Sequence, residues 1–128
     1  MIRYFDSSVL LQLIFNLDGR KILRVSDIHQ NFTSRLSQVE VFRTVMKMKP
    51  ELLSDAVDLL SEVEYIELSD RVIDNASSYP QEITLKSSDA IHMATAELLL
   101  DIDDVLVTFD KQMAKNAELL GIKTLTSF

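Results

Sequence analysis

Two aspartates directly follow the two most strand-like stretches of the sequence. Asp6 comes after the short apolar stretch 2–5, and Asp110 comes after the β-branched run 105–109. In an open α/β sheet, ligands bind outside the carboxyl ends of the strands, so both carboxylates are predicted to emerge at one such edge. A buried negative charge destabilises a protein unless it has a positively charged partner, so both aspartates are candidates for a functional site.

Two further acids are predicted to reach the same edge. Glu40 stands beside Val39, at the border of the apolar stripe of a predicted helix, and Asp89 opens an alanine-rich helix. Four converging carboxylates repel each other strongly unless a divalent cation joins them. Oxygen-only ligation, in a chain with no cysteine and two histidines, favours Mg²⁺ or Mn²⁺ over zinc. A water activated by such a cation can attack a phosphodiester in line.

Each of these acids also has a purely structural interpretation. Asp6 and Asp110 are suitable N-caps for the helices that follow them. Glu40 can pair with Arg43, three residues further along its helix. Asp89 suits the first turn of a helix because of the helix dipole. Taken singly, the positions leave both interpretations open, and their combination is what favours a metal site.

Three other groups of residues are candidates for a role at the site. His92 follows Asp89 by one helical turn, but packing within the alanine-rich helix is the favoured interpretation because two histidines make no zinc constellation. Arg43 has two equally supported interpretations. It can orient Glu40 or contact a phosphate, or it can form an ordinary ion pair with Glu40. Other basic residues are candidates for contacts with backbone phosphates, against the default of a solvated surface. These are Arg20, Lys21, Arg24, Lys47 and Lys49.

The positive charge is concentrated in the first part of the chain. The formal net charge is −7, which by itself argues against nucleic acid as a partner. Residues 1–49 nevertheless hold eight basic and four acidic residues, whereas residues 50–128 hold five basic and sixteen acidic residues. An anionic substrate can therefore still be received by the first part.

Length and composition limit the class of protein. The 128 residues suit one domain, residues 1–128. The absence of cysteine excludes a disulfide framework and a thiol nucleophile. The sequence has no secretory signal pattern and no apolar run of bilayer length, so a cytoplasmic protein without a membrane anchor is predicted.

Strands alternate with helices along the chain. Strands are predicted at residues 2–5, 30–34, 65–68, 105–109 and 122–125. Helices are predicted at residues 9–17 with Ser7 or Ser8 as N-cap, from Ser34 or Ser37 to 49, at 51–63, at 69–77, from Ser87 or Ser88 to 100, and at 111–120. Strands joined by right-handed crossovers predict a three-layer α/β/α sandwich with a mainly parallel central sheet.

Helical spacing also predicts which side chains face the core. The second helix has an apolar stripe at helical spacing, with Leu36, Val39, Phe42, Arg43 and Met46 in that register. The third helix is predicted to bury Leu52, Leu53, Ala56, Val57, Leu60 and Val63, and the fourth to turn Val72, Ile73 and Ala76 inward. Pro50 should end one helix and begin the next, and Gly121 should end the last one.

Four segments resemble the PIN-domain nucleases, and most closely the VapC-type toxins of toxin–antitoxin pairs. They are residues 4–10 (YFDSSVL), 37–43 (SQVEVFR), 88–96 (SDAIHMATA) and 107–111 (VTFDK), in the family's order along the whole chain. The resemblance implies a PIN-like fold. It assigns an acidic quartet that holds Mg²⁺ or Mn²⁺, together with a hydroxyl near the metal at Ser8 and a polar residue at Thr108. The quartet is Asp6, Glu40, Asp89 and Asp110.

The same resemblance implies a small metal-dependent endoribonuclease that acts on RNA, commonly forms a homodimer and is inhibited by a cognate antitoxin. A housekeeping RNA-processing nuclease and a non-catalytic dimerisation or partner-binding module are alternatives on the same fold. A phosphotransfer protein is less compatible. An aspartyl-phosphate phosphatase needs a second aspartate where this chain has Ser8, and a receiver domain needs paired acids upstream of Asp6.

Overall fold

The computed structural model describes residues 1–16 and 30–127. Several features predicted from the sequence lie outside the described residues. They are the last residue of the first predicted helix, Leu17, and three of the candidates for phosphate contact, Arg20, Lys21 and Arg24.

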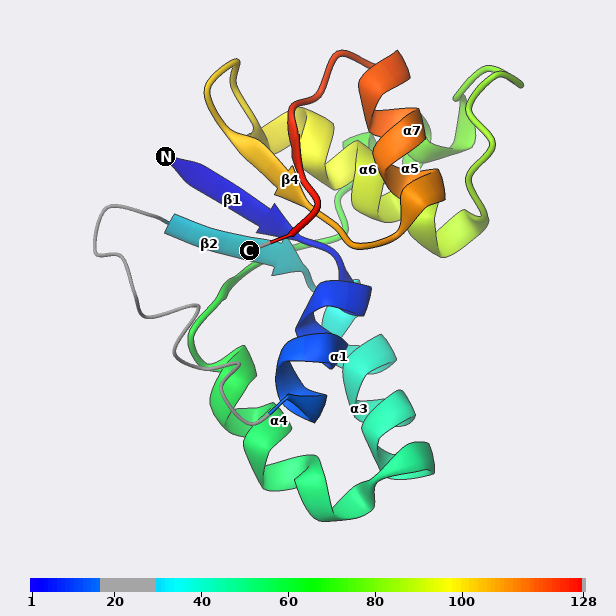
Figure 1. The fold of residues 1–128 in the computed structure, drawn as a ribbon. Coiled ribbons are helices and arrows are strands. Elements are labelled where there is room, and N and C mark those ends of the chain that lie inside the picture. The colour runs from blue at the N-terminus through cyan, green and yellow to red at the C-terminus, as the bar shows by residue number, and fades with distance from the viewer. Residues whose placement is uncertain (17–29, 128) are drawn as a thin grey trace.

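Five parallel strands form the central sheet, in the order β3-β2-β1-β4-β5. The strands are β1 (Ile2–Phe5), β2 (Gln30–Ser34), β3 (Glu64–Ile66), β4 (Val105–Val107) and β5 (Thr124–Leu125). The arrowheads of β1, β2 and β4 point to the same edge (Figure 1). The predicted α/β fold with a parallel central sheet is therefore confirmed, and the carboxyl ends of the strands share one edge.

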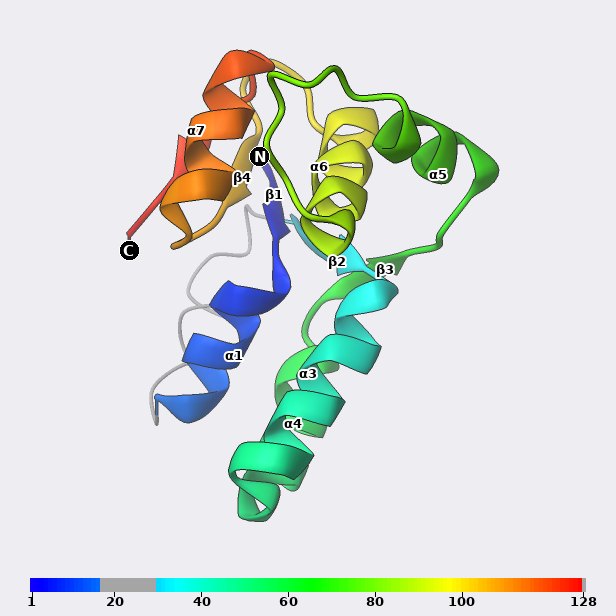
Figure 2. The same cartoon turned by 90° about the vertical axis from the view of Figure 1, so that its right-hand side faces the viewer.

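Helices cover both faces of the sheet (Figures 1 and 2). One group comprises α1 (Ser7–Phe15), α3 (Leu36–Met48) and α4 (Leu53–Leu60), the last two joined through the 3-10 turn η1 (Pro50–Leu52). The other group comprises α5 (Asp70–Ser77), α6 (Ser87–Leu99) and α7 (Lys111–Leu119). Within the described residues, no helix has the length and apolarity to cross a membrane. The cytoplasmic location stays a prediction.

The alternation of side chains along the two central strands separates two cores. Phe5, Val105 and Val107 pack with residues of α1, α3 and α4. Tyr4 and Leu106 point the other way and pack with residues of α6 and α7. Strands with apolar residues on both faces are typical of a parallel sheet covered by helices. This arrangement holds β1 and β4 at the centre of the fold. Asp6 directly follows β1, whereas Asp110 follows β4 by three residues, because the strand predicted at 105–109 ends at Val107.

The sequence offered two alternatives for the N-cap of α1, and the structure has the second of them. The helix begins at Ser7, and Asp6 rather than Ser7 or Ser8 is its N-cap, because the Asp6 carboxylate accepts the backbone N–H of Val9. An aspartate caps a helix as well as a serine does, so local preference alone does not choose among the three residues.

The start of α6 corrects a second cap prediction. Lys86 holds the N-cap position without a side-chain hydrogen bond, and Ser87 and Ser88 belong to the first turn. Two other helix boundaries agree with the prediction from the sequence. Pro50 opens the turn between α3 and α4, and Gly121 follows α7 with a φ of 75°, the left-handed conformation of a C′ glycine.

The core-facing side of α3 was predicted wrongly. Ser37, Val41 and Val45 are buried, whereas Val39 and Met46 are 56% and 53% exposed. Because α3 carries apolar residues on more than one face, helical spacing alone does not identify the face that packs on the sheet.

Smaller errors of the same kind occur in α4 and α5. Val57 was predicted to be buried and is 52% exposed, while its neighbour Leu59 fills the core. Ile73 is 40% exposed, and Val72 is the buried residue of α5. Leu60, Ala56 and Val63 are buried as predicted.

Candidate functional site

Asp6 is held at the junction of β1 and α1 by bonds to both carboxylate oxygens. Its Oδ1 accepts hydrogen bonds from Ser8 Oγ at 2.7 Å and from Val9 N at 3.1 Å, and its Oδ2 accepts one from Thr108 Oγ1 at 2.5 Å. The side chain is almost fully buried. A carboxylate has about four acceptor sites, so capping α1 still leaves Asp6 one site for a ligand. Its structural and chemical roles are therefore compatible.

Thr108 links Asp6 to the start of α7. Its buried hydroxyl donates to Asp6 Oδ2 and accepts from the backbone N–H of Asp110 at 3.2 Å. Asp110 is the N-cap of α7, since its Oδ1 accepts from Gln112 N at 2.8 Å and Met113 N at 3.0 Å. One threonine thus fixes the relative placement of two acids that come from neighbouring strands.

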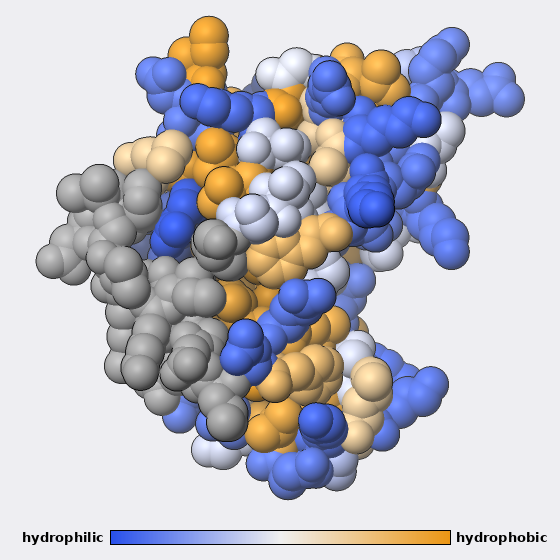
Figure 3. Space-filling model, in the orientation of Figure 1, coloured by the Kyte–Doolittle hydropathy of each residue, from blue (hydrophilic) through white to orange (hydrophobic). Residues whose placement is uncertain are grey.

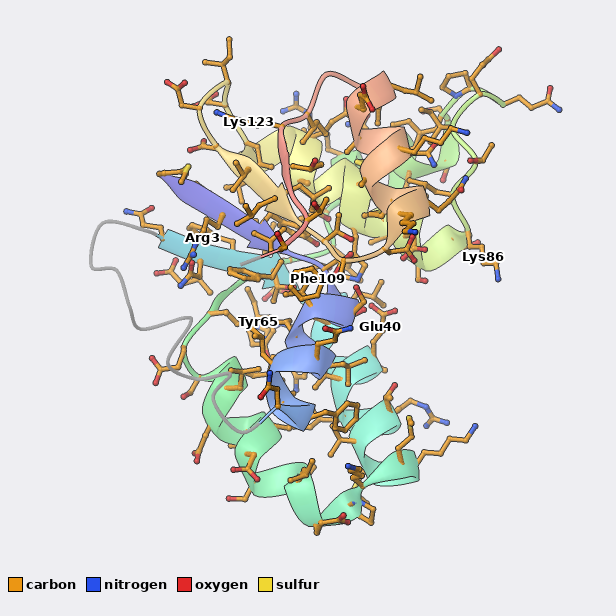
Figure 4. All side chains as sticks on the ribbon, in the orientation of Figure 1. Arg3, Glu40, Tyr65, Lys86, Phe109 and Lys123 are labelled. Atoms are coloured by element: carbon orange, nitrogen blue, oxygen red, sulfur yellow. The ribbon has the colours of Figure 1, made fainter. Side chains whose placement is uncertain are left out.

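Glu40 lies in α3, near the carboxyl ends of the strands, and is hydrogen-bonded to a buried histidine. Its Oε1 lies 2.6 Å from His92 Nε2, and His92 Nδ1 lies 2.7 Å from the hydroxyl of Tyr4. His92 and Tyr4 are fully buried, whereas the Glu40 side chain is 27% exposed. Glu40 lies beside the start of α1, on the side where the strands end (Figure 4). Within the described residues Glu40 contacts His92, and no ion pair with Arg43, the alternative that the sequence left open, is present.

Asp89 lies half-buried in the first turn of α6 and is influenced by the other three acids. Burial is the largest cause that raises the pKa of its carboxyl above the usual 3.8, and His92 opposes this rise. The negative charges of Asp110, Asp6 and Glu40 raise the pKa of Asp89 further. A charge changes the pKa of another group only when the two lie near each other. Asp6, Glu40 and Asp110 are therefore near enough to Asp89 for their charges to act on it.

The four carboxylates do not form a closed cage. Among the described residues, 1–16 and 30–127, no three acidic or histidine side chains come close enough together to enclose a metal ion. The surface is hollowed on the right side of the molecule, between the upper helices and α3 (Figure 3). The donor set still fits Mg²⁺ or Mn²⁺, because it consists of carboxylate oxygens and Mg²⁺ usually takes one or two carboxylates and keeps several waters.

The pKa of Asp89 leads to a prediction about stability. Because this pKa is raised above the unfolded value, the folded chain retains a proton that the unfolded chain releases, and stability falls as pH rises through the raised pKa. Asp89→Asn has no charge to bury, so it should stabilise the cation-free protein at about pH 7 and give no advantage at about pH 3. Thermal melting in chelator at both pH values measures this difference. A variant less stable than the wild type at neutral pH would contradict the expected sign.

Sequence reasoning set His92 aside and missed Tyr4. His92 is packed inside α6 as predicted, but it also contacts Glu40 directly. Its spacing from Asp89 was the available signal, because residues three apart on a helix share a face. The partner Tyr4 had no such signal, since its hydroxyl meets His92 only through the pairing of distant segments.

Arg43 lies away from the hydrogen-bonded network, on the exposed part of α3. It lines a hollow of about 820 Å³ together with Phe42, Met46 and Lys47. The hollow combines two positive charges with apolar surface, so it can contact an anionic or amphipathic partner. Its position on α3 places it on the same helix as Glu40.

Comparison with known proteins gives consistent similarities. The model of the PIN domain family matches residues 3–119. Ribonuclease VapC35 from Mycobacterium tuberculosis is 33% identical over 93% of this chain and 92% of its own length. A toxin–antitoxin complex from Klebsiella pneumoniae contains a chain that is 26% identical, with a TM-score of 0.68 over 88% of this chain and 90% of that one. VapBC2 from Rickettsia felis, bound to a promoter DNA fragment, shares the fold with a TM-score of 0.74 at 17% identity, over 98% of both chains.

Proposed function

The chain belongs to the PIN domain family, and we propose that it is an endoribonuclease that uses Mg²⁺ or Mn²⁺ to hydrolyse RNA phosphodiester bonds. One observation carries the proposal: at the carboxyl edge of the sheet, Thr108 joins Asp6 to the backbone of Asp110. Besides burial, the charges of Asp110, Asp6 and Glu40 raise the pKa of Asp89 at the same edge. A scaffold gains nothing from grouping carboxylates that repel each other, whereas a cation site requires them. The similarity to a protein named as a ribonuclease supports RNA as the substrate.

Asp6, Asp89 and Asp110 would hold the cation, and Glu40 would complete the site as the fourth acid of the quartet. All four offer oxygen, the donor that hard divalent cations prefer. When bound, the cation supplies positive charge to the phosphate and lowers the pKa of the attacking water. The positive charge of the cation would also relieve the mutual repulsion of the carboxylates.

The side chains around the edge orient the reacting groups. Ser8 and Thr108 hold the Asp6 carboxylate by a bond to each oxygen, so that it cannot rotate out of the site. His92 engages Oε1 of Glu40, and Oε2 remains to orient the attacking water or accept its proton. A preorganised edge of this kind costs little reorganisation during the reaction.

We further propose that the protein is the toxin of a toxin–antitoxin pair and forms a homodimer. Support for a cognate antitoxin comes from the similarity to a chain of a toxin–antitoxin complex. Support for a protein interface comes from large apolar side chains that are exposed on α3, at its end and on α4. These are Val39, Met46, Met48 and Val57.

The test is cleavage of a set of single-stranded RNAs by purified protein in EDTA, Mg²⁺ or Mn²⁺. Cleavage should be lost in EDTA and return with either cation, because the carboxylates alone provide no positive charge for the phosphate. Equal cleavage with and without chelator would contradict a metal-dependent mechanism. No cleavage of any RNA by a protein that does bind Mn²⁺ would favour the non-catalytic partner-binding module.

A further inference from the structure

We propose that His92 and Tyr4 are positioning residues that hold the Glu40 carboxylate in the orientation required by the cation site. The inference rests on the proposed function and adds two residues to it. The chain of contacts runs from Tyr4 in β1 through His92 in α6 to Glu40 in α3, and its two steps measure 2.7 Å and 2.6 Å. It thus connects the central strand of the sheet, a helix of one layer and a helix of the other.

The direction of the hydrogen bonds follows from the chemistry of the groups. An ionised carboxylate only accepts, so His92 Nε2 carries the hydrogen that is donated to Glu40. The Nδ1 atom accepts from the Tyr4 hydroxyl when the imidazole is neutral and donates to the Tyr4 oxygen when the imidazole is charged, so the contact persists in both states. Burial raises the pKa of Tyr4, against hydrogen bonds with Ser34 and Thr95, so its hydroxyl keeps its proton.

The burial of the two inner residues makes this chain rigid. Tyr4 and His92 are both completely buried, and their rings meet edge to face at 64° with centroids 6.0 Å apart. Neither ring can turn without losing its packing, so the Nε2 atom is a fixed donor at the end of a rigid chain.

The Glu40 carboxylate requires the hydrogen bond from His92 to keep its position. Its side chain has several rotatable bonds, and Asp89, whose pKa the Glu40 charge raises, repels it. Without the bond to His92, repulsion would favour rotamers that move Glu40 away from the other acids. Partners that hydrogen-bond to metal ligands commonly set ligand orientation, and their loss lowers metal affinity or activity about 10–100-fold.

The experiment measures Mn²⁺ affinity by calorimetry for wild type, His92→Leu, His92→Gln and Tyr4→Phe. Leucine fills the cavity without a donor and should weaken Mn²⁺ binding about 10–100-fold. Glutamine supplies an amide N–H near the position of Nε2 and should restore most of the affinity. Tyr4→Phe removes one hydroxyl and keeps the ring, so it should fold and show a smaller loss than His92→Leu.

A second readout separates positioning from general support of the fold. In a Glu40→Ala background, His92→Leu should cause no further loss of Mn²⁺ affinity, because its effect passes through Glu40. Losses that multiply in the double variant would overturn the proposal, as would wild-type Mn²⁺ affinity in both Tyr4→Phe and His92→Leu. If His92→Leu does not fold, Tyr4→Phe and His92→Gln decide: the proposal is overturned if Tyr4→Phe keeps wild-type affinity or if His92→Gln loses as much as Glu40→Ala. Failure of the wild type itself to bind Mn²⁺ would instead refute the proposed function.

Discussion

Asp6→Asn should lower RNA cleavage by about 10²–10³-fold or more while the fold stays intact. The variant loses the negative charge that would face the cation. Asparagine is an equally good N-cap, so its Oδ1 can still accept from Val9 N and Ser8 Oγ, and its amide can donate to Thr108 Oγ1. The change therefore separates charge from shape at a buried position. Cleavage rates at saturating Mg²⁺, with circular dichroism as a check of the fold, measure the effect.

The matched control for this change is Asp103→Asn, which removes the same charge from the exposed turn before β4. It should cleave RNA at the wild-type rate, because the residue belongs to neither the edge nor the core. Wild-type activity in Asp6→Asn would refute the site assignment, and equal losses in both variants would point to net charge rather than to a specific site.

Leu106→Ala should reduce the free energy of unfolding by about 2–5 kcal/mol, a large part of the total stability of a small domain. Leu106 is fully buried in β4, between β1 and β5, and packs into the core with Met93, Met113 and Ala117. Truncation leaves a cavity that rigid neighbouring strands cannot close. Urea unfolding at equilibrium gives the difference directly.

Ile102→Ala is the control for this stability prediction. Ile102 lies in the turn just before β4 and is 90% exposed, so losing its side chain should change stability by less than about 0.5 kcal/mol. A similar cost in both variants would mean that β4 is not the packed centre of the sheet.

The sequence predicted the fold and the placement of two acids after neighbouring strands for the same physical reason. Period-two alternation fails in the strand 105–107 and gives a continuous apolar run, which marks it as central in a parallel sheet. Because β1 and β4 are neighbours, Asp6 lies next to Thr108, and Thr108 connects it to Asp110. This step depends only on the strands and on the positions of polar residues directly after them.

What failed were features decided by packing between distant segments. The apolar pattern of α3 fits more than one orientation, and the choice of Val41 and Val45 over Val39 and Met46 is made by contact with α1, α4 and the sheet. The bond from His92 to Glu40 joins residues 52 positions apart, so no local pattern indicates it. The open spacing of the carboxylates likewise depends on the three-dimensional positions of four separate segments.

Thermal melting with and without millimolar Mg²⁺ or Mn²⁺, for wild type and Asp6→Asn side by side, tests most directly whether the acidic edge binds a divalent cation. A cation that binds the native state must stabilise it and so raise its melting temperature. At a cation concentration of one hundred times the dissociation constant, the gain in the free energy of unfolding is about 2.7 kcal/mol. We predict a rise in the wild type that is absent or strongly reduced in Asp6→Asn. An equal shift in both proteins, or no shift in the wild type at any cation concentration, would contradict a metal site at Asp6.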